Sequence, residues 1–184
     1  MAFDATYDAC VLHPPGLRDL LIRLAMTGMF RAHWSNEILD EVVRSILRRR
    51  PDLTQSQLSR TRELMCNAVP DCLTTGYEEL IDGLNLPDAD DRHVLAAAIR
   101  SGSQVIVTEN LRDFPADVLQ TYNIEAQIPD VFLLHLVDLS PRTVSGVLEA
   151  QAASLRNPPM NIDELLDRLA QSGLPRSIAA LRAR

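Results

Sequence analysis

The chain has 184 residues, a net charge of −7 and a hydrophobic fraction of 46%, which is sufficient for one domain with an ordinary core. It has no apolar run near the roughly 18 residues of a membrane span, and its first residues carry Asp4 and Asp8 instead of a basic, apolar leader. We therefore expect no membrane association and no signal peptide. Three scattered cysteines (Cys10, Cys66 and Cys72) lack zinc-ligand spacing and favour a reducing, cytoplasmic location.

The basic residues are unusual because all 18 are arginines. Six of them fall between positions 44 and 62, a span in which Asp52 is the only acid. Such a patch could hold a phosphate backbone, or it could be a solvated helix end whose arginines complement the dipole. The absence of lysine excludes receiver domains, Walker-type nucleotide loops and haloacid-dehalogenase-like phosphatases, because each of these needs one.

Strands and helices alternate in the first part of the chain. An apolar run at 9–12 ends at the break His13-Pro14-Pro15, and residues 69–86 show no clear pattern. Ser35 and the Thr54/Gln57 pair are typical helix N-terminal signals. The hydrophobic pattern predicts strands over 2–7, 29–34, 104–107 and 124–127, and helices over 15–28, 36–49, 55–67, 90–101, 115–122 and 129–137.

Beyond about residue 140 only helices are predicted, over 141–156, 162–172 and 175–182. We therefore divide the chain into a domain of residues 1–139 and a helical extension of residues 140–184. The alternation in the first domain predicts an α/β fold, a three-layer α/β/α sandwich with a central parallel sheet. In such a fold the carboxyl ends of the strands lie along one edge, where ligands bind.

Four carboxylates are expected at that edge. Asp8 and Asp113 follow strands, whereas Glu41 and Asp91 lie near the beginnings of helices. Asp91, Asp113 and Glu41 each have an ordinary explanation as a cap, turn or surface residue, whereas Asp8 interrupts an apolar stretch near a strand end. The prediction rests on the joint occurrence of the four. Their repulsion requires a compensating cation, and carboxylate oxygens suit Mg²⁺ or Mn²⁺, ions that support phosphodiester hydrolysis.

Four segments in this order resemble the motifs of PIN domains. They are Tyr-Asp-Ala-Cys-Val-Leu at 7–12, Ser-Asn-Glu-Ile-Leu-Asp-Glu at 35–41, Asp-Asp-Arg-His-Val-Leu-Ala-Ala-Ala at 90–98 and Val-Thr-Glu-Asn-Leu-Arg-Asp-Phe-Pro at 107–115. The likeness covers about residues 3–137 and is strongest to VapC-type toxins of bacterial toxin–antitoxin pairs. The tail resembles the C-terminal extension of a longer VapC subgroup. This resemblance implies a PIN-like fold and a Mg²⁺- or Mn²⁺-dependent endoribonuclease that cuts RNA, is inhibited by a VapB-like antitoxin and forms a homodimer.

The resemblance also assigns roles to residues. It implies that Asp8, Asp91 and Asp113 bind metal, and that Glu41 orients or deprotonates the attacking water. Supporting positions are Thr108, Asn110, Glu37 and Asp90. Glu37 is the rival of Glu41, and Asp90 is the rival of Asp91. Asn110 stands where many PIN domains have aspartate, so either Asn110 or Asp113 could contact the metal.

The arginines are candidates for RNA contacts. Arg92 and Arg112 are candidates for the scissile phosphate, whereas Arg44, Arg48, Arg49 and Arg50 would hold RNA farther away. With aromatic residues at only 4%, recognition of RNA shape and backbone is favoured over base stacking. Two alternatives remain open: a non-catalytic PIN scaffold that binds RNA or protein, and a PIN nuclease of RNA maturation outside toxin–antitoxin systems.

Overall fold

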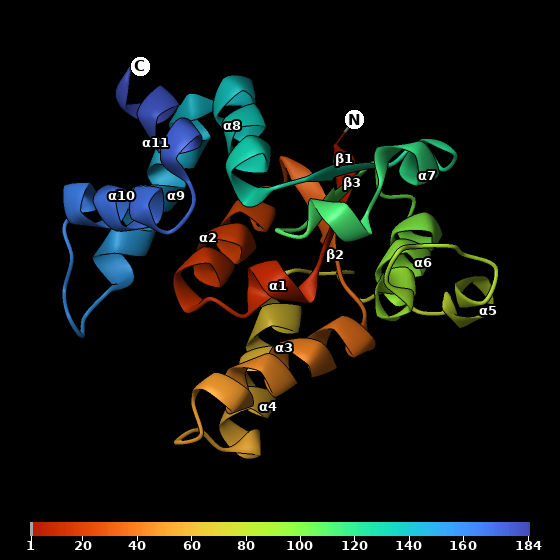
Figure 1. The fold of residues 1–184 in the computed structure, drawn as a ribbon. Helices are drawn as coiled ribbons and strands as arrows, with labels where there is room; N and C mark the ends of the chain where they lie inside the picture. The colour runs from red at the N-terminus through yellow and green to blue at the C-terminus, as the bar shows by residue number, and fades with distance from the viewer. Residues whose placement is uncertain (1) are drawn as a thin grey trace.

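The computed structural model describes residues 2–184 and contains one four-stranded sheet (Figure 1). The strands are β1 (Phe3–Tyr7), β2 (Phe30–His33), β3 (Val105–Val107) and β4 (Glu125–Gln127). They lie in the order β2-β1-β3-β4, and every neighbouring pair is parallel. The predicted parallel sheet is confirmed. Since the chain first moves from β1 to β2 and then crosses to β3, the strand order reverses between β1 and β3, the place where such sheets bind ligands.

Helices cover both faces of the sheet. Helix α6 (Arg92–Ser101) packs against β1 and β3 on one face (Figure 1). Helices α2 (Pro15–Ala25) and α8 (Pro129–Leu139) lie on the other face, where the ring of Phe132 makes an edge contact with that of Phe30 at 5.1 Å. The predicted three-layer sandwich is thereby confirmed.

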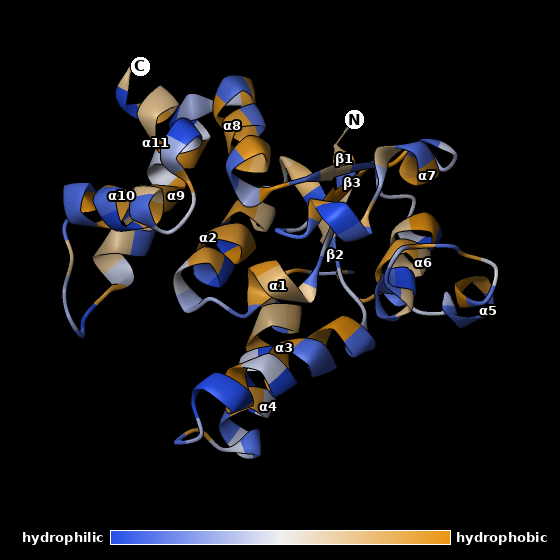
Figure 2. Cartoon of the chain, in the orientation of Figure 1, coloured by the Kyte–Doolittle hydropathy of each residue, from blue (hydrophilic) through white to orange (hydrophobic). Residues whose placement is uncertain are grey.

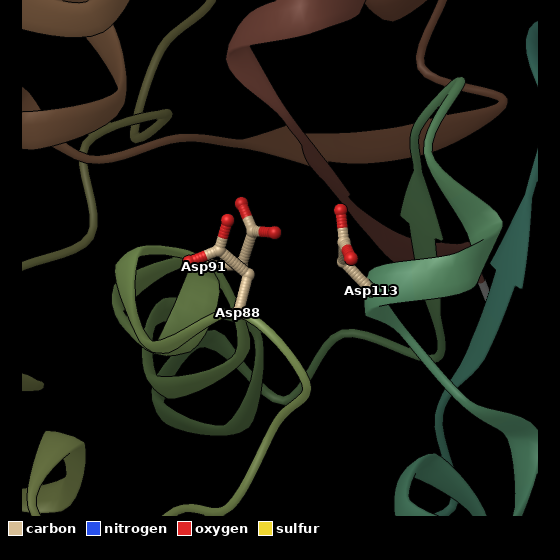
Figure 3. Close-up of side chains that lie close together, drawn as sticks. All are labelled: Asp88, Asp91 and Asp113. Carbon is tan, nitrogen blue, oxygen red and sulfur yellow. The ribbon is translucent and has the colours of Figure 1, made fainter.

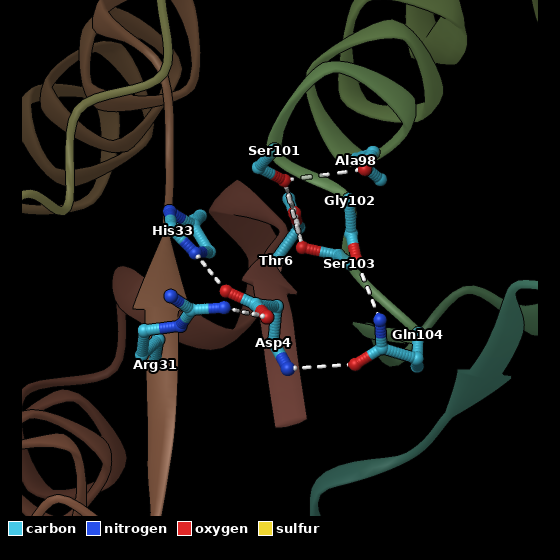
Figure 4. A network of polar contacts seen from close by, with 9 residues as sticks. All are labelled: Asp4, Thr6, Arg31, His33, Ala98, Ser101, Gly102, Ser103 and Gln104. Carbon is cyan, nitrogen blue, oxygen red and sulfur yellow. Dashed lines mark hydrogen bonds and ion pairs between the residues drawn. The ribbon is translucent and has the colours of Figure 1, made fainter. Parts of the chain in front are cut away.

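The face of β1 beneath α6 is polar, although it is buried (Figure 4). Arg31 on β2 donates to the Asp4 carboxylate at 2.6 Å, and a ring nitrogen of His33 lies 2.7 Å from it. The hydroxyls of Thr6 and Ser103 are 2.8 Å apart. Buried polar groups are stable when they are paired in this way, so the network ties β1 to β2 and to the end of α6.

Helices α3 (Asn36–Arg49) and α4 (Gln55–Ala68) form a hairpin beyond β2. Both begin at the predicted residues: the Ser35 hydroxyl accepts the Ile38 amide at 3.1 Å, and Thr54 and Gln57 form a capping box. The apolar stripe of α3 is buried, whereas the tip of the hairpin is hydrophilic (Figure 2).

Several short elements connect these layers. Residues predicted as an apolar run before a break form helix α1 (Ala9–Leu12), and the region without a clear pattern contains α5 (Glu78–Ile81). The 3₁₀ turn η1 (Ala89–Asp91) precedes α6, so that helix begins at Arg92 instead of residue 90. A second 3₁₀ turn, η2 (Leu111–Asp113), and helix α7 (Ala116–Gln120) lead from β3 to β4.

The C-terminal extension consists of α9 (Pro141–Ser154), α10 (Ile162–Gln171) and α11 (Pro175–Arg182). It packs on α2 and α8, and its apolar residues join the same core as the sheet. Asp130 of α8 is 2% exposed and accepts the amide and hydroxyl of Ser177 at 2.8 and 2.7 Å. The predicted boundary between residues 139 and 140 remains a prediction. Within residues 2–184, none of the helices combines the length and the apolarity that crossing a membrane requires.

Candidate active site

Asp8 lies at the carboxyl end of β1, beside the end of β3. Because Tyr7 pairs with Val107, the strand register brings Thr108 next to Asp8. The Asp8 side chain is buried, and its Oδ2 accepts the Thr108 hydroxyl at 2.7 Å and the Cys10 thiol at 3.0 Å. These two donors fix one carboxylate oxygen of Asp8.

Three other carboxylates meet across a narrow gap (Figure 3). Asp88 and Asp91 lie at the start of α6, whereas Asp113 lies opposite them on η2. One oxygen from each lies within 4.8 Å of the others. Asp88 also accepts the Asp90 amide at 2.9 Å, which holds the turn that brings Asp88 and Asp91 to the same side.

Asp91 is the centre of the negative charge. Burial, followed by the charges of Asp8, Asp113, Asp88 and Glu41 in decreasing order, raises the pKa of Asp91 to about 7. Such a shift means that the protein's own cations do not balance this cluster. A set of closely spaced carboxylate oxygens with uncompensated charge fits a hard divalent cation.

Glu41 has a different environment. Nε2 of the buried His93 is 3.1 Å from Glu41 Oε1, and Arg44 lies 3.7 Å from the same oxygen. Burial by itself would lower the pKa of His93, but the hydrogen bond to Glu41 and the nearby negative charges raise it. Glu41 therefore has an arginine and a hydrogen-bonding histidine as partners within the protein. Its rival Glu37 is exposed, lies 3.8 Å from Nδ1 of His93 and accepts the Tyr77 hydroxyl at 3.4 Å.

A cavity of about 320 Å³ brings three of the predicted acids together. Its lining residues are Asp8, Ala9, Cys10, His13, Glu41, Arg44, Ser45, Arg48, Asp91 and Asn110. Asp113 is joined to this wall, because the Asn110 side-chain amide donates to its carboxylate. Asp91 thus belongs both to the cavity and to the three-carboxylate cluster.

The predicted site residues that do not line this cavity include Asp90 and four arginines. Asp90 is exposed and contributes to neither group of acids. Arg92 is half-buried and Arg112 is exposed, and neither lines the cavity. Arg49 and Arg50 line a neighbouring groove.

Two residues of the site were missed in the sequence. Asp88 belongs to the acidic cluster, and its spacing of three residues from Asp91 could have revealed it, since that spacing places two side chains on one side of a helical turn. Cys10 was not among the predicted site residues, yet its thiol donates to Asp8. Burial and the Asp8 charge raise the pKa of this thiol far above its usual value.

The site lies at the strand-order reversal of a parallel α/β/α sandwich. A family model described as PIN domain matches residues 4–112, which is more than half of the chain, so the chain belongs to the PIN domain family. A second model, described as VapC50 C-terminal domain, matches residues 129–183. The resemblance seen in the sequence, to a VapC-type PIN protein with a C-terminal extension, is confirmed.

One curated relative extends the comparison. The chain is 42% identical over 108 residues to the protein named "Putative ribonuclease VapC50" of Mycobacterium tuberculosis (strain ATCC 25618 / H37Rv). The aligned region covers 56% of this chain and 63% of the relative, so it spans less than two thirds of that protein. No solved structure gives a significant match to the chain.

Proposed function

We propose that this protein is a divalent-cation-dependent endoribonuclease and the toxin of a type II toxin–antitoxin pair. The observation that carries the proposal is the position of Asp91, which joins the three-carboxylate cluster to the acid-lined cavity and has a raised pKa. The relative's printed name, a ribonuclease, supports the same activity.

Asp8, Asp91 and Asp113 would hold Mg²⁺ or Mn²⁺, with Asp88 close to the last two. A bound ion of this kind would lower the pKa of a water molecule and stabilise the leaving oxygen of the phosphodiester. Thr108 and Cys10 hold one oxygen of Asp8, and within residues 2–184 no donor reaches its other oxygen.

Glu41 would orient or deprotonate the attacking water. It is half-buried on the cavity wall, and the hydrogen bond from His93 fixes its direction. General-base catalysis by a positioned side chain contributes about 10²–10⁴-fold in rate. We interpret His93 as a residue that positions Glu41.

The substrate proposed is RNA, held through its phosphates. Arg44 and Arg48 line the acid cavity, and Arg49 and Arg50 line the groove beside it. Arg92 and Arg112 do not line the cavity and stay candidates for contacts with the scissile phosphate from outside it. These arginines lie beside the acidic residues, so they could bind the phosphates of an RNA strand whose backbone passes the proposed metal site.

A VapB-like antitoxin and a homodimer complete the proposal, both on the basis of the VapC-type family. A reducing, cytoplasmic site of action is supported by the three cysteines, all of which are free thiols. Co-expression with the antitoxin should relieve growth arrest caused by the protein alone.

The test is RNA cleavage with Mg²⁺ or Mn²⁺. Asp8→Ala and Asp91→Ala should each abolish cleavage, whereas Asp90→Ala, which removes an exposed neighbour, should retain it. Undiminished cleavage by both Asp8→Ala and Asp91→Ala would refute the site. A protein that binds RNA but neither cuts it nor gains thermal stability from Mn²⁺ would be a non-catalytic scaffold.

A further inference from the structure

A groove of about 390 Å³ adjoins the catalytic cavity. It lies between the turn before α2 and the hairpin of α3 and α4, and His13 lines both hollows. Its lining residues are His13, Pro14, Pro15, Arg18, Ile46, Arg49, Arg50, Leu53, Gln57, Leu58 and Thr61. Nothing in the proposed chemistry at Asp91 uses this groove.

The groove is electropositive, since arginines but no carboxylates line it. Arg18 donates to the Leu12 and His13 carbonyls at 2.9 and 3.2 Å, and Arg50 pairs with Asp52 at 2.6 Å. Arg49 has no hydrogen-bond or ion-pair partner within residues 2–184. Consistent with a positive field, burial together with the charges of Arg49 and Arg18 lowers the pKa of His13.

The floor of the groove is aliphatic. Pro14, Pro15, Ile46, Leu53 and Leu58 line it, and Leu58 is 5% exposed. Gln57 and Thr61 add polar groups. The volume is within the roughly 300–1,000 Å³ of small-molecule sites, and an apolar floor with one available guanidinium suits a flat heterocycle that carries a phosphate.

We propose that this groove is a nucleotide subsite that takes one unpaired base of single-stranded RNA beside the cleaved bond, with Arg49 on its phosphate. The inference rests on the proposed nuclease function. An acidic peptide would satisfy the same charges, but RNA is favoured by continuity. Arg48 lines the acid cavity and Arg49 lines the groove, so one strand can pass from one to the other over His13.

Abasic substitution tests the base. A labelled single-stranded RNA 12-mer is prepared with one abasic nucleotide moved along the sequence, and each version is digested by the wild-type protein. One position next to the cut should slow cleavage about fivefold or more, because base contacts contribute about 1–3 kcal/mol. Thr61→Phe, which fills the groove, should cleave the abasic and intact RNAs at equal rates. Thr61→Val, which has the shape of threonine, should retain the difference.

Arginine variants test the phosphate in an independent assay. Binding of the intact 12-mer is measured on the non-cleaving Asp91→Asn protein, into which Arg49→Ala or Arg60→Ala is added. Both changes remove one positive charge from the hairpin, but Arg60 does not line the groove. We expect the dissociation constant to rise about fivefold or more for Arg49→Ala and less than twofold for Arg60→Ala.

The outcomes separate the two proposals. If the wild-type protein cuts no RNA, the proposed function fails. If it cuts RNA but no abasic position matters, or Thr61→Phe still distinguishes abasic from intact RNA, the nucleotide subsite is refuted and an acidic peptide becomes the occupant to test. Equal effects of Arg49→Ala and Arg60→Ala would also refute it, since they would reflect net charge alone. Unfolding temperatures close to that of the parent would show that each variant is folded.

Discussion

The two sides of the acid cavity balance their charge in different ways. On one side, Arg44 lies 3.7 Å from Glu41 and His93 forms a hydrogen bond with it, so groups of the protein itself offset its charge. On the other, Asp91 faces further carboxylates and has a pKa raised to about 7. The number of acids in a site therefore does not by itself locate a cation. Charge remains uncompensated on the Asp91 side, where closely spaced carboxylate oxygens suit a divalent cation.

The largest expected effect is the loss of cleavage when the Asp91 side is changed. Asp91→Asn removes the central carboxylate and should lower the cleavage rate more than about 100-fold, the loss that even a group behind a metal ligand can cause. Asp90→Asn makes the same chemical change at an exposed neighbour and should lower it less than about twofold, the ordinary effect of a surface change. Initial rates on labelled RNA measure both, and equal rates would remove Asp91 from the centre of the site.

The next effect is stabilisation by the cation. Mn²⁺ at 100 times its dissociation constant should stabilise the wild-type protein by about 2.7 kcal/mol, or roughly 5–10 °C in melting temperature for a chain of this size. Asp91→Asn should lose most of this shift, whereas Glu41→Gln should retain most of it. Thermal unfolding with and without Mn²⁺ measures the shift. If only Glu41→Gln lost the shift, the cation would bind on the Glu41 side and not on the Asp91 side.

A smaller effect is expected in the way Asp91 makes the stability of the fold depend on pH. Because the folded-state pKa of Asp91 is raised from 3.8 to about 7, the folded state holds its proton more tightly. Asp91 therefore favours folding most at low pH, and this contribution is lost as the pH rises from about 4 to about 7. After allowance for solvent screening we expect Asp91→Asn to be about 1 kcal/mol more stable than wild type at pH 8 in EDTA. Urea unfolding at pH 5 and pH 8 tests this, and an advantage confined to pH 5 would contradict the sign.

On the Glu41 side, His93→Gln should lower cleavage about tenfold, because the glutamine amide replaces the hydrogen bond but not the charge. The pH profile of cleavage should change, while stabilisation by Mn²⁺ stays intact. His93→Ala should be slower than His93→Gln. If His93→Gln lowered Mn²⁺ stabilisation as much as Asp91→Asn, the two sides would not be separable.

The smallest effect is expected at Cys10, one of two donors to Asp8. Cys10→Ser keeps a donor and should cleave at nearly the wild-type rate, whereas Cys10→Ala should cut about threefold more slowly, near the lower range for a single hydrogen bond. Rates at saturating Mn²⁺ measure the difference. Equal rates for serine and alanine would show that Thr108 suffices to hold Asp8.

The fold could be predicted largely because its signals are local. Ser35 and the Thr54/Gln57 pair mark helix starts, and both form the expected hydrogen bonds. Helix α1 was missed because four residues are too few to show a helical period, and α5 has the same length. The sequence predicted that α6 begins at residue 90, two residues before its first residue, Arg92. The prediction differs because the 3₁₀ turn η1 runs directly into α6 with a different hydrogen-bond pattern.

The sequence predicts which strand ends and helix starts converge at the site, but it does not predict the contacts among the side chains there. That Asp8 meets Asp91 at the sheet edge follows from parallel topology. The contact of His93 with Glu41 joins residues 52 apart in the sequence and depends on how α3 packs beside α6, which no local pattern encodes. The participation of Asp88, in contrast, is consistent with a local signal, its spacing of three residues from Asp91.

Asp130 links the stability of the C-terminal extension to that of the domain that carries the acids. Its buried carboxylate accepts the Ser177 amide and hydroxyl and the Arg176 amide, at the start of the last helix. Removing that helix would take these three donors away from Asp130 and would expose the apolar residues of α8 on which the helix packs. A shortened chain that ended before residue 175 would therefore be degraded as a whole in the cell, because the loss of its last helix would destabilise the domain that carries the acids.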